Sequence, residues 1–388
     1  MAPPRVVLAG YMVRYPLGGY AWQALHFLSG LRTLGCDVFF YEDTEYYGDA
    51  YVPGADAMTT DYDYGVRAAT DFFSAHGFGD AWAFWDAAAD TTYGANAERT
   101  RAALADADLF INLAGVNRVP SARRPRAVAA YVDLDPAYTQ LRLAQGDAAL
   151  AAMVGEHTVH FTLGESIGTD ACRIPTGHVR WQPLRQPIVP ELWEPLPPEP
   201  GAPFTTIGKW DATGRDVTFD GEVFGWRKRT EWFRFLDLPR ATGQRFSPAM
   251  DVASRPEDLA RLEAAGWEVV DPLEVSRDPR VYRAFIRSSG GEFTVAKDVN
   301  VRLRSGWFSD RSACYLAAGR PVVNQDTGFD EHLPTGEGLF TFRTPSDAVA
   351  AFATIAADYP RQCRAARRLA EEHFAPARVL AALVGAAR

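Results

Sequence analysis

The sequence predicts an α/β protein made of two doubly wound domains that face each other across a cleft. Short apolar runs typical of buried parallel strands alternate with helical patterns along most of the chain. A segment with eight prolines within residues 183–203 divides this alternation into two halves. The length of 388 residues fits two domains, because a single hydrophobic core rarely serves more than about 250–300 residues.

The N-terminal half opens with a strand-helix-strand pattern. The run RVVLA at residues 5–9 predicts a buried strand, a loop with Gly18 and Gly19 precedes a helix that Gly35 ends, and DVFFYED at 37–43 predicts the next strand. We expect a helix at 98–107, strands at 107–115, 127–136 and 157–166, and a long loop at 45–64, which lacks periodicity. This alternation is Rossmann-like, and it places strand ends rich in Gly, Asp and Asn where such sheets bind ligands.

The alternation resumes after the prolines and predicts a second Rossmann-like domain. The expected helices cover 227–239, 256–266, 278–289, 310–319 and segments beyond Pro345, and the expected strands cover 204–210, 267–272, 291–297, 320–325 and 338–342. We therefore expect an N-terminal domain at 1–185, a stiff proline-rich linker at 186–203 and a C-terminal domain from 204 to 370.

Composition limits the classes of function. Hydrophobic residues make up 47% and charged residues 23%, as in ordinary globular proteins. The net charge of −9 and the lack of a long basic run argue against nucleic acid as a partner. No stretch approaches the ~20 apolar residues of a membrane helix, so we expect a cytoplasmic protein that is not an integral membrane protein. Its four cysteines are scattered singly, which predicts neither a zinc knuckle nor a disulfide framework.

One segment of about 35 residues carries a family resemblance. The strings AAGRPVV at 317–323, TGFDE at 327–331 and GEGLF at 336–340 follow one another in an order that resembles the donor-binding domain of GT-B-fold glycosyltransferases. The resemblance implies a nucleotide-sugar donor on the C-terminal domain and an acceptor on the N-terminal domain. The ending at 371–388 looks like the closing helix of this fold, which returns to the first domain.

The chain departs from the best-known retaining members of this fold. Those members carry two glutamates spaced E-x7-E before the Gly-x-Pro step, and the matching positions here are Gly306 and Cys314. The chain thus resembles a divergent branch without the glutamate pair, and its stereochemical outcome stays open.

The resemblance and simple electrostatics together predict the donor site. A helix N-terminus offers free N–H groups to phosphate, and basic side chains neutralise a leaving diphosphate without a metal. We expect no metal site and no cofactor besides the nucleotide-diphosphate sugar as co-substrate. The predicted donor residues are Gly18, Gly19, Lys209, Arg227, Lys228, Asp271, Ser309, Arg311, Ser312, Thr327, Gly328, Phe329 and Asp330.

The acids Asp133 and Asp135 end an apolar run and are the predicted catalytic residues. Asp133 is the first choice for the general base of an inverting transfer, with His26, His157 and Glu165 as other candidates. Both aspartates could also bind a metal or cap a turn.

We expect a metal-independent glycosyltransferase (hexosyltransferase-like) acting on a small-molecule or glycan acceptor. A nucleotide-sugar epimerase of the same fold and a non-catalytic nucleotide-sugar sensor are the alternatives. Trp82, Phe84 and Trp85 would suit a ring-bearing acceptor, but core packing explains them equally well.

Overall fold

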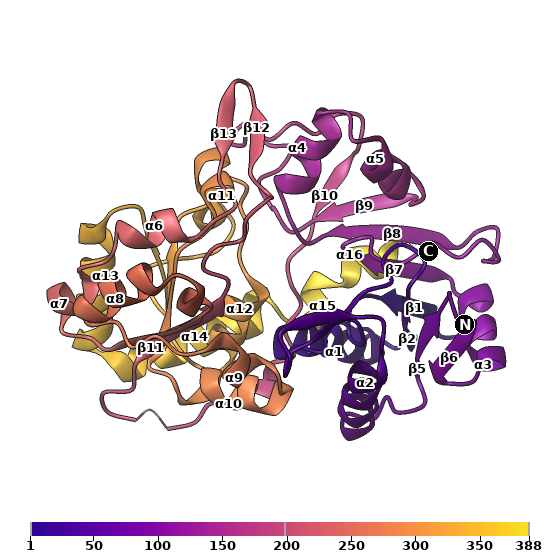
Figure 1. Ribbon diagram of the computed structural model, residues 1–388, viewed down its shortest axis with the longest axis horizontal. Helices are drawn as coiled ribbons and strands as arrows, with labels where there is room; N and C mark the ends of the chain where they lie inside the picture. The colour runs from indigo at the N-terminus through magenta and orange to yellow at the C-terminus, as the bar shows by residue number, and fades with distance from the viewer. Residues whose placement is uncertain (1, 198, 387–388) are drawn as a thin grey trace.

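The computed structural model describes residues 2–197 and 199–386 and contains two parallel sheets, each flanked by helices (Figure 1). The N-terminal sheet has the order β10-β9-β8-β7-β1-β2-β5-β6, and only β6 runs antiparallel to its neighbour. Its strands are β1 (Arg5–Ala9), β2 (Asp37–Asp43), β5 (Trp82–Asp86), β6 (Thr91–Gly94), β7 (Leu109–Leu113), β8 (Val128–Asp133), β9 (Val159–Thr162) and β10 (Trp181–Pro183). The helices of this half are α1 (Gly18–Thr33), α2 (Asp63–Ala75), α3 (Ala97–Asp106), α4 (Tyr138–Ala144) and α5 (Ala148–Gly155).

The C-terminal sheet is wholly parallel and has the order β14-β11-β15-β16-β17. Its strands are β11 (Phe204–Gly208), β14 (Phe246–Met250), β15 (Gly291–Thr294), β16 (Val322–Gln325) and β17 (Leu339–Phe342). Around it lie α6 (Arg229–Phe233), α7 (Leu238–Thr242), α8 (Pro256–Ala264), α9 (Pro272–Ser276), α10 (Pro279–Ser288), α11 (Asp298–Leu303), α12 (Asp310–Ala317) and α13 (Pro345–Ala357), with an antiparallel hairpin of β12 (Val217–Phe219) and β13 (Glu222–Phe224). The predicted class, α/β with two Rossmann-like halves, is confirmed.

The strands form where the sequence places continuous apolar runs. Val6, Val7 and Leu8 in β1 are all buried, because this central strand has a neighbour on each side and helices on both faces. Helix α1 follows, and Gly35 after it adopts a positive φ of 80° that a residue with a Cβ rarely takes.

The end of the chain returns to the N-terminal half. Helix α14 (Tyr359–His373) is followed by α15 (Pro376–Val379), which lies beside α1 in Figure 1, and by α16 (Ala381–Gly385). Gly30 of α1 allows this approach, since a Cβ there would lie 2.6 Å from Cβ of Pro376. One continuous apolar core therefore includes residues from both halves and from the final helices.

Three expected elements differ from the structure. The helix expected at 227–239 is divided into α6 and α7, because Pro239 cannot continue the hydrogen-bond ladder of a preceding helix. The strand expected at 267–272 makes only two isolated bridges, to Phe246 and Ala249 of β14. Strand β14 itself was not among the expected elements. Pro248 interrupts its pattern, although proline is tolerated on an edge strand such as this one.

The third difference concerns the loop expected at 45–64. Residues here form a short antiparallel hairpin of β3 (Ala50–Val52) and β4 (Ala57–Thr59), and α2 begins at Asp63. None of the helices in the described ranges has the length and apolar character needed to cross a bilayer.

Candidate functional site

Two cations lie together at the carboxyl ends of β11 and β15. Arg311, in the first turn of α12, donates from Nε to Glu292 (2.6 Å), from Nη1 to the Ile207 carbonyl (2.6 Å) and from Nη2 to the Thr294 hydroxyl (3.2 Å). Lys228 donates from Nζ to the same Thr294 hydroxyl (3.2 Å). We call Lys228, Arg311, Glu292 and Thr294 the cation centre.

The cation centre combines two basic side chains with one acidic side chain. Burial lowers the pKa of Lys228 well below its usual range, and the neighbouring Arg311 lowers it further. Glu292 also accepts from the Thr206 hydroxyl through Oε1 (2.9 Å), while its buried Oε2 has no hydrogen-bond partner within the described part of the chain. One carboxylate faces two basic side chains, and a bound anion would favour the protonated form of Lys228.

A second charged group joins the two halves of the molecule. Asp135, just after β8, lies 3.1 Å from Arg215 Nη1 and 3.6 Å from Lys297 Nζ. Lys297 follows β15 and sits over the Trp226 ring, 3.3 Å from its centroid. Burial lowers the pKa of Lys297 to about 8, although Asp135 acts in the opposite direction.

Asp133, two residues earlier, has a different environment. It is buried and accepts hydrogen bonds from Thr139 (2.7 Å), Gln140 (2.8 Å), Thr162 (2.8 Å) and the Asp135 amide (3.2 Å). Burial raises the pKa of Asp133, and these hydrogen bonds oppose that shift. Asp133 thus ties the end of β8 to α4 and β9, whereas Asp135 faces the C-terminal half.

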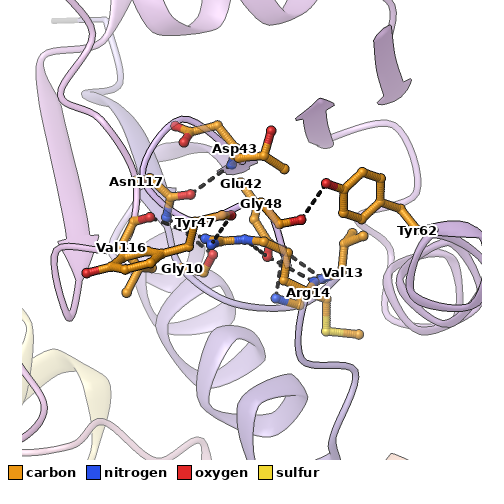
Figure 2. Close-up of polar contacts among 12 residues, drawn as sticks. Gly10, Val13, Arg14, Glu42, Asp43, Tyr47, Gly48, Tyr62, Val116 and Asn117 are labelled. Atoms are coloured by element: carbon orange, nitrogen blue, oxygen red, sulfur yellow. Dashed lines mark hydrogen bonds and ion pairs between the residues drawn. The ribbon is translucent and has the colours of Figure 1, made fainter. Parts of the chain in front are cut away.

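The loop after β1 is held by a buried ion pair, shown in Figure 2. Glu42 accepts from the backbone amides of Met12 (2.8 Å), Val13 (2.6 Å) and Arg14 (3.0 Å), and also from Arg14 Nε (3.0 Å). The Arg14 guanidinium then donates to the carbonyls of Tyr47 (2.9 Å) and Val116 (3.2 Å), which lie in two other loops. This pair therefore fixes three loops at the carboxyl edge of the N-terminal sheet.

The fixed loops present a cluster of tyrosines. The ring centroids of Tyr11 and Tyr15 are 5.1 Å apart, those of Tyr11 and Tyr20 are 5.5 Å apart, and Tyr15 is stacked with Tyr51 at 6.3 Å. Burial raises the pKa of Tyr20, and the charge of Asp135 raises it further. We call Tyr11, Tyr15, Tyr20 and Tyr51 the tyrosine cluster.

No known protein family matches the sequence, and no curated protein matches it either. Solved structures match over nearly the whole chain. An alpha-glucosyltransferase in complex with UDP shares 11% identity at a TM-score of 0.60, over 98% of this chain and 99% of that one. Sucrose-phosphate synthase from Thermosynechococcus elongatus shares 10% at 0.53 (99% and 98% covered), and AviGT4, a glycosyltransferase involved in avilamycin A biosynthesis, shares 15% at 0.52 (100% and 97% covered). The chain has the GT-B fold.

In this GT-B fold the predicted donor residues occupy several different surroundings. Lys228 and Arg311 lie in the cation centre, and Lys209 is an exposed residue just after β11. Arg227 instead pairs with Asp211 and Asp216, both at 3.3 Å.

The start of α12 contributes two of the predicted serines. Ser309 is the N-cap residue, and its hydroxyl donates to the Asp310 carboxylate (3.2 Å) instead of accepting from a helix amide. The buried Ser312 hydroxyl has no hydrogen-bond partner in the ranges described. Burial raises the pKa of Asp310, a shift that the neighbouring Arg311 opposes.

The glycine-rich turn after β16 is occupied largely by internal contacts. Thr327 donates to the Trp307 carbonyl (2.7 Å), and Phe329 packs against Phe308 with centroids 5.3 Å apart. Gly328 has a φ of 90° and donates its N–H to the preceding Asp326 (2.7 Å). Asp330 remains part-exposed, 3.9 Å from Arg304.

The neighbours of Gly18, Gly19 and Asp271 belong to other parts of the molecule than the cation centre. Gly18 begins α1 and faces Tyr282 of α10, whose Cβ would be 2.5 Å from an added Cβ. Gly19 has far more room, since its nearest such neighbour is the Tyr282 hydroxyl at 3.9 Å. Asp271 is exposed and caps α9 by accepting from the Leu273 amide (2.9 Å).

The other candidate bases are held in local contacts. His26 lies between the Val189 amide (3.1 Å) and the Trp193 indole (2.9 Å), and burial lowers its pKa to about 3. Burial likewise lowers the pKa of His157 to about 4. Glu165 forms a two-armed ion pair with Arg185 (2.8 and 2.7 Å).

Gly306 and Cys314, at the positions of the glutamate pair in retaining members of this fold, are tightly enclosed. Gly306 has a φ of 75°, and an added Cβ would lie 2.5 Å from the Ser166 amide nitrogen of the N-terminal half. Cys314 is buried 4.0 Å from His26. A larger side chain at Gly306 would push the two halves apart, so the missing glutamate pair is part of how this chain packs.

Sequence reasoning missed Glu292, Thr294, Lys297, Arg215 and the tyrosine cluster. The one available signal for Glu292 was a charged residue inside the apolar run GEFTVAK at 291–297, and Lys297 is the last residue of that run. Trp82 and Phe84, which were considered for acceptor binding, are buried core residues. Within the described ranges, no group of three His, Cys, Asp or Glu side chains is placed to hold a metal.

Proposed function

We propose that this protein transfers a glycosyl group from a nucleotide-diphosphate sugar to an acceptor bound by its N-terminal half. The observation that carries the proposal is the cation centre, where Arg311 and Lys228 share one Thr294 hydroxyl at the carboxyl ends of two parallel strands. Ligands of open parallel sheets bind at this edge. The match to a glycosyltransferase fold solved with UDP supports the same placement.

The diphosphate would bind at the cation centre and gain charge as the glycosidic bond breaks. Fixed cations stabilise that charge without reorganising, and such contacts contribute several kcal/mol in a site that excludes water. Lys297, held over Trp226, would add a third cation from the next loop. These side chains would replace a metal ion, so the proposed transfer is metal-independent.

Asp135 is the proposed general base, in place of Asp133. Its carboxylate pairs with Lys297 of the C-terminal half, whereas the Asp133 oxygens are already used by four donors. The base would take a proton from an acceptor hydroxyl as that oxygen attacks the anomeric carbon. A ring-bearing small molecule or glycan suits the tyrosine cluster, because phenol rings stack on flat or sugar rings.

Nucleic acid is another class of acceptor to consider, because a structural neighbour was solved in complex with DNA. One alpha-glucosyltransferase of this fold is solved in complex with UDP and DNA. The net charge of −9 on the present chain disfavours a phosphate backbone as partner.

The test is binding and turnover with a panel of nucleotides and nucleotide sugars that includes UDP and UDP-glucose. We expect calorimetric binding of at least one nucleoside diphosphate and slow hydrolysis of the matching sugar donor, both weakened in the Lys228→Met variant. A panel in which no nucleotide binds would refute the proposal. Binding without hydrolysis or transfer to any acceptor would favour the sensor, and conversion of the donor without release of nucleotide would favour the epimerase.

A further inference from the structure

A cavity separate from the cation centre lies between the two halves, lined by residues of α1, α2 and α10, and α10 runs beside α1 in Figure 1. Its volume is about 140 Å³. One wall carries the aromatic rings of Trp22, Phe72 and His76, and the other carries Arg280, Arg283 and Arg287. None of these six residues belongs to the cation centre.

The three arginines share one face of α10, because residues spaced by three, four and seven fall on the same side of a helix. Arg280 is paired with Asp278 at 2.8 Å, and Arg287 donates from Nε to the Glu194 carbonyl at 2.7 Å. Arg283 lies over the Trp22 ring at 5.7 Å from the centroid. Its Nε is buried and finds no hydrogen-bond partner in the part of the chain that the structure describes.

The charge on two of these three arginines is not balanced by an ion pair in the described ranges. In the described ranges, no carboxylate lies within ion-pair distance of Arg283 or Arg287, although the chain as a whole carries a net charge of −9. Burial and the neighbouring Arg287 lower the pKa of Arg283, while Glu194 raises it. Like charges four residues apart on a helix destabilise it, and a buried donor without a partner costs further free energy.

From these observations we infer that the cavity binds the phosphate group of a small anion. Guanidinium groups match the oxygens of phosphate with two parallel hydrogen bonds, and a phosphate dianion balances more than one arginine. The volume of about 140 Å³ is well below the roughly 300 Å³ at which pockets for drug-sized ligands begin, so the cavity suits a phosphate rather than a whole nucleotide.

A phosphate here would connect the two halves of the molecule. The cavity wall from α1 and α2 belongs to the N-terminal half, and α10 belongs to the C-terminal half. The Trp22 indole already donates to the Pro279 carbonyl (2.7 Å) across this boundary. The site does not depend on the proposed function, because it shares no residue with the cation centre.

The test titrates inorganic phosphate and, separately, glucose 6-phosphate into the full chain, with sodium chloride at matched ionic strength as the blank. Binding is followed by calorimetry and by the rise in Tm. The variants are Arg283→Gln and Arg287→Gln, and the matched control is Arg240→Gln, an arginine of α7 whose side chain is 75% exposed. Circular dichroism checks that each variant is folded, and UDP binding is measured in parallel.

We expect phosphate to bind and each pocket variant to weaken it about tenfold, with Arg240→Gln unchanged. Equal affinity for both probes would identify phosphate alone as the ligand, whereas tighter glucose 6-phosphate would show that the sugar ring adds contacts at the aromatic wall. No binding of either probe up to about 10 mM, or binding that both variants leave unchanged, would overturn the inference. Loss of UDP binding would concern the proposed function and leave this site unaffected.

Discussion

Lys297 Nζ lies 3.6 Å from a carboxylate oxygen of Asp135. Lys297 follows β15 of the C-terminal sheet, and Asp135 follows β8 of the N-terminal sheet. The pair is where the two halves of the molecule bring a basic and an acidic group to one place. Its two members have separate proposed roles, since Lys297 would bind phosphate and Asp135 would accept a proton.

Lys297 should give nucleotide binding a pH dependence. Burial lowers its pKa to about 8, so the ammonium form exists below that pH and is lost as the pH rises through it. The Kd for UDP, measured by calorimetry from pH 6 to 9.5, should therefore increase above about pH 8. The Lys297→Met variant should bind about tenfold more weakly below pH 8 and lack this rise, and a rise that persists in the variant would assign it to another group.

Substitutions of the two aspartates at the end of β8 should affect different quantities, turnover for Asp135 and stability for Asp133. Asp135→Asn removes the proposed base and should lower kcat by about 10²–10⁴ with little loss of stability. Asp133→Asn disturbs three buried hydrogen bonds and one part-buried hydrogen bond, and it should lower the free energy of unfolding by about 1.5–3 kcal/mol. Urea unfolding and single-turnover rates on both variants check this, and equal loss of turnover from a fully stable Asp133→Asn would return the base to Asp133.

Arg311 should matter for stability as well as for binding. Arg311→Met leaves Glu292 buried without its ion pair, which should cost about 3–5 kcal/mol in the free energy of unfolding. The exposed pair Arg245 and Glu268 is the control, because Arg245→Met should change the free energy of unfolding far less. Similar costs for the two variants, measured by urea unfolding, would contradict this picture of the cation centre.

Neighbouring glycines at the start of α1 should respond differently to the same change. Gly18→Ala places a Cβ 2.5 Å from Tyr282 across the two halves, and we expect a loss of about 1–3 kcal/mol from overpacking. Gly19→Ala meets nothing closer than 3.9 Å and should be neutral or stabilising by up to about 1 kcal/mol. Thermal unfolding of the two variants makes the comparison, and a neutral Gly18→Ala would show that α1 and α10 separate easily.

Glu42 should hold the loop after β1. Glu42→Gln replaces an acceptor of three backbone amides with a group that also donates, and it leaves Arg14 without its carboxylate. We expect a loss of about 3–5 kcal/mol and faster hydrogen exchange at the amides of Met12, Val13 and Arg14. Unchanged exchange at these three amides would show that the loop is held by other contacts.

The sequence by itself determined the class of fold, because strands buried on both faces must be continuous apolar runs and helices must carry a regular apolar face. The family resemblance and simple electrostatics also pointed to Lys228 and Arg311 as donor-site residues, a role that stays a prediction, and the positions of the family's glutamate pair are Gly306 and Cys314 here. It did not predict β14, since Pro248 breaks the strand pattern and only the edge position makes it tolerable.

The pairing of Asp135 with Lys297 was decided by tertiary structure alone, as was the difference between Asp135 and Asp133. Both aspartates end the same apolar run, and no local pattern says which side chain turns inward to Thr139 and Gln140. The tyrosine cluster likewise joins residues of the first loop to Tyr51 of a hairpin. Sequence patterns fix periodicity and burial, whereas distances between residues more than 100 positions apart depend on how the two sheets pack against each other.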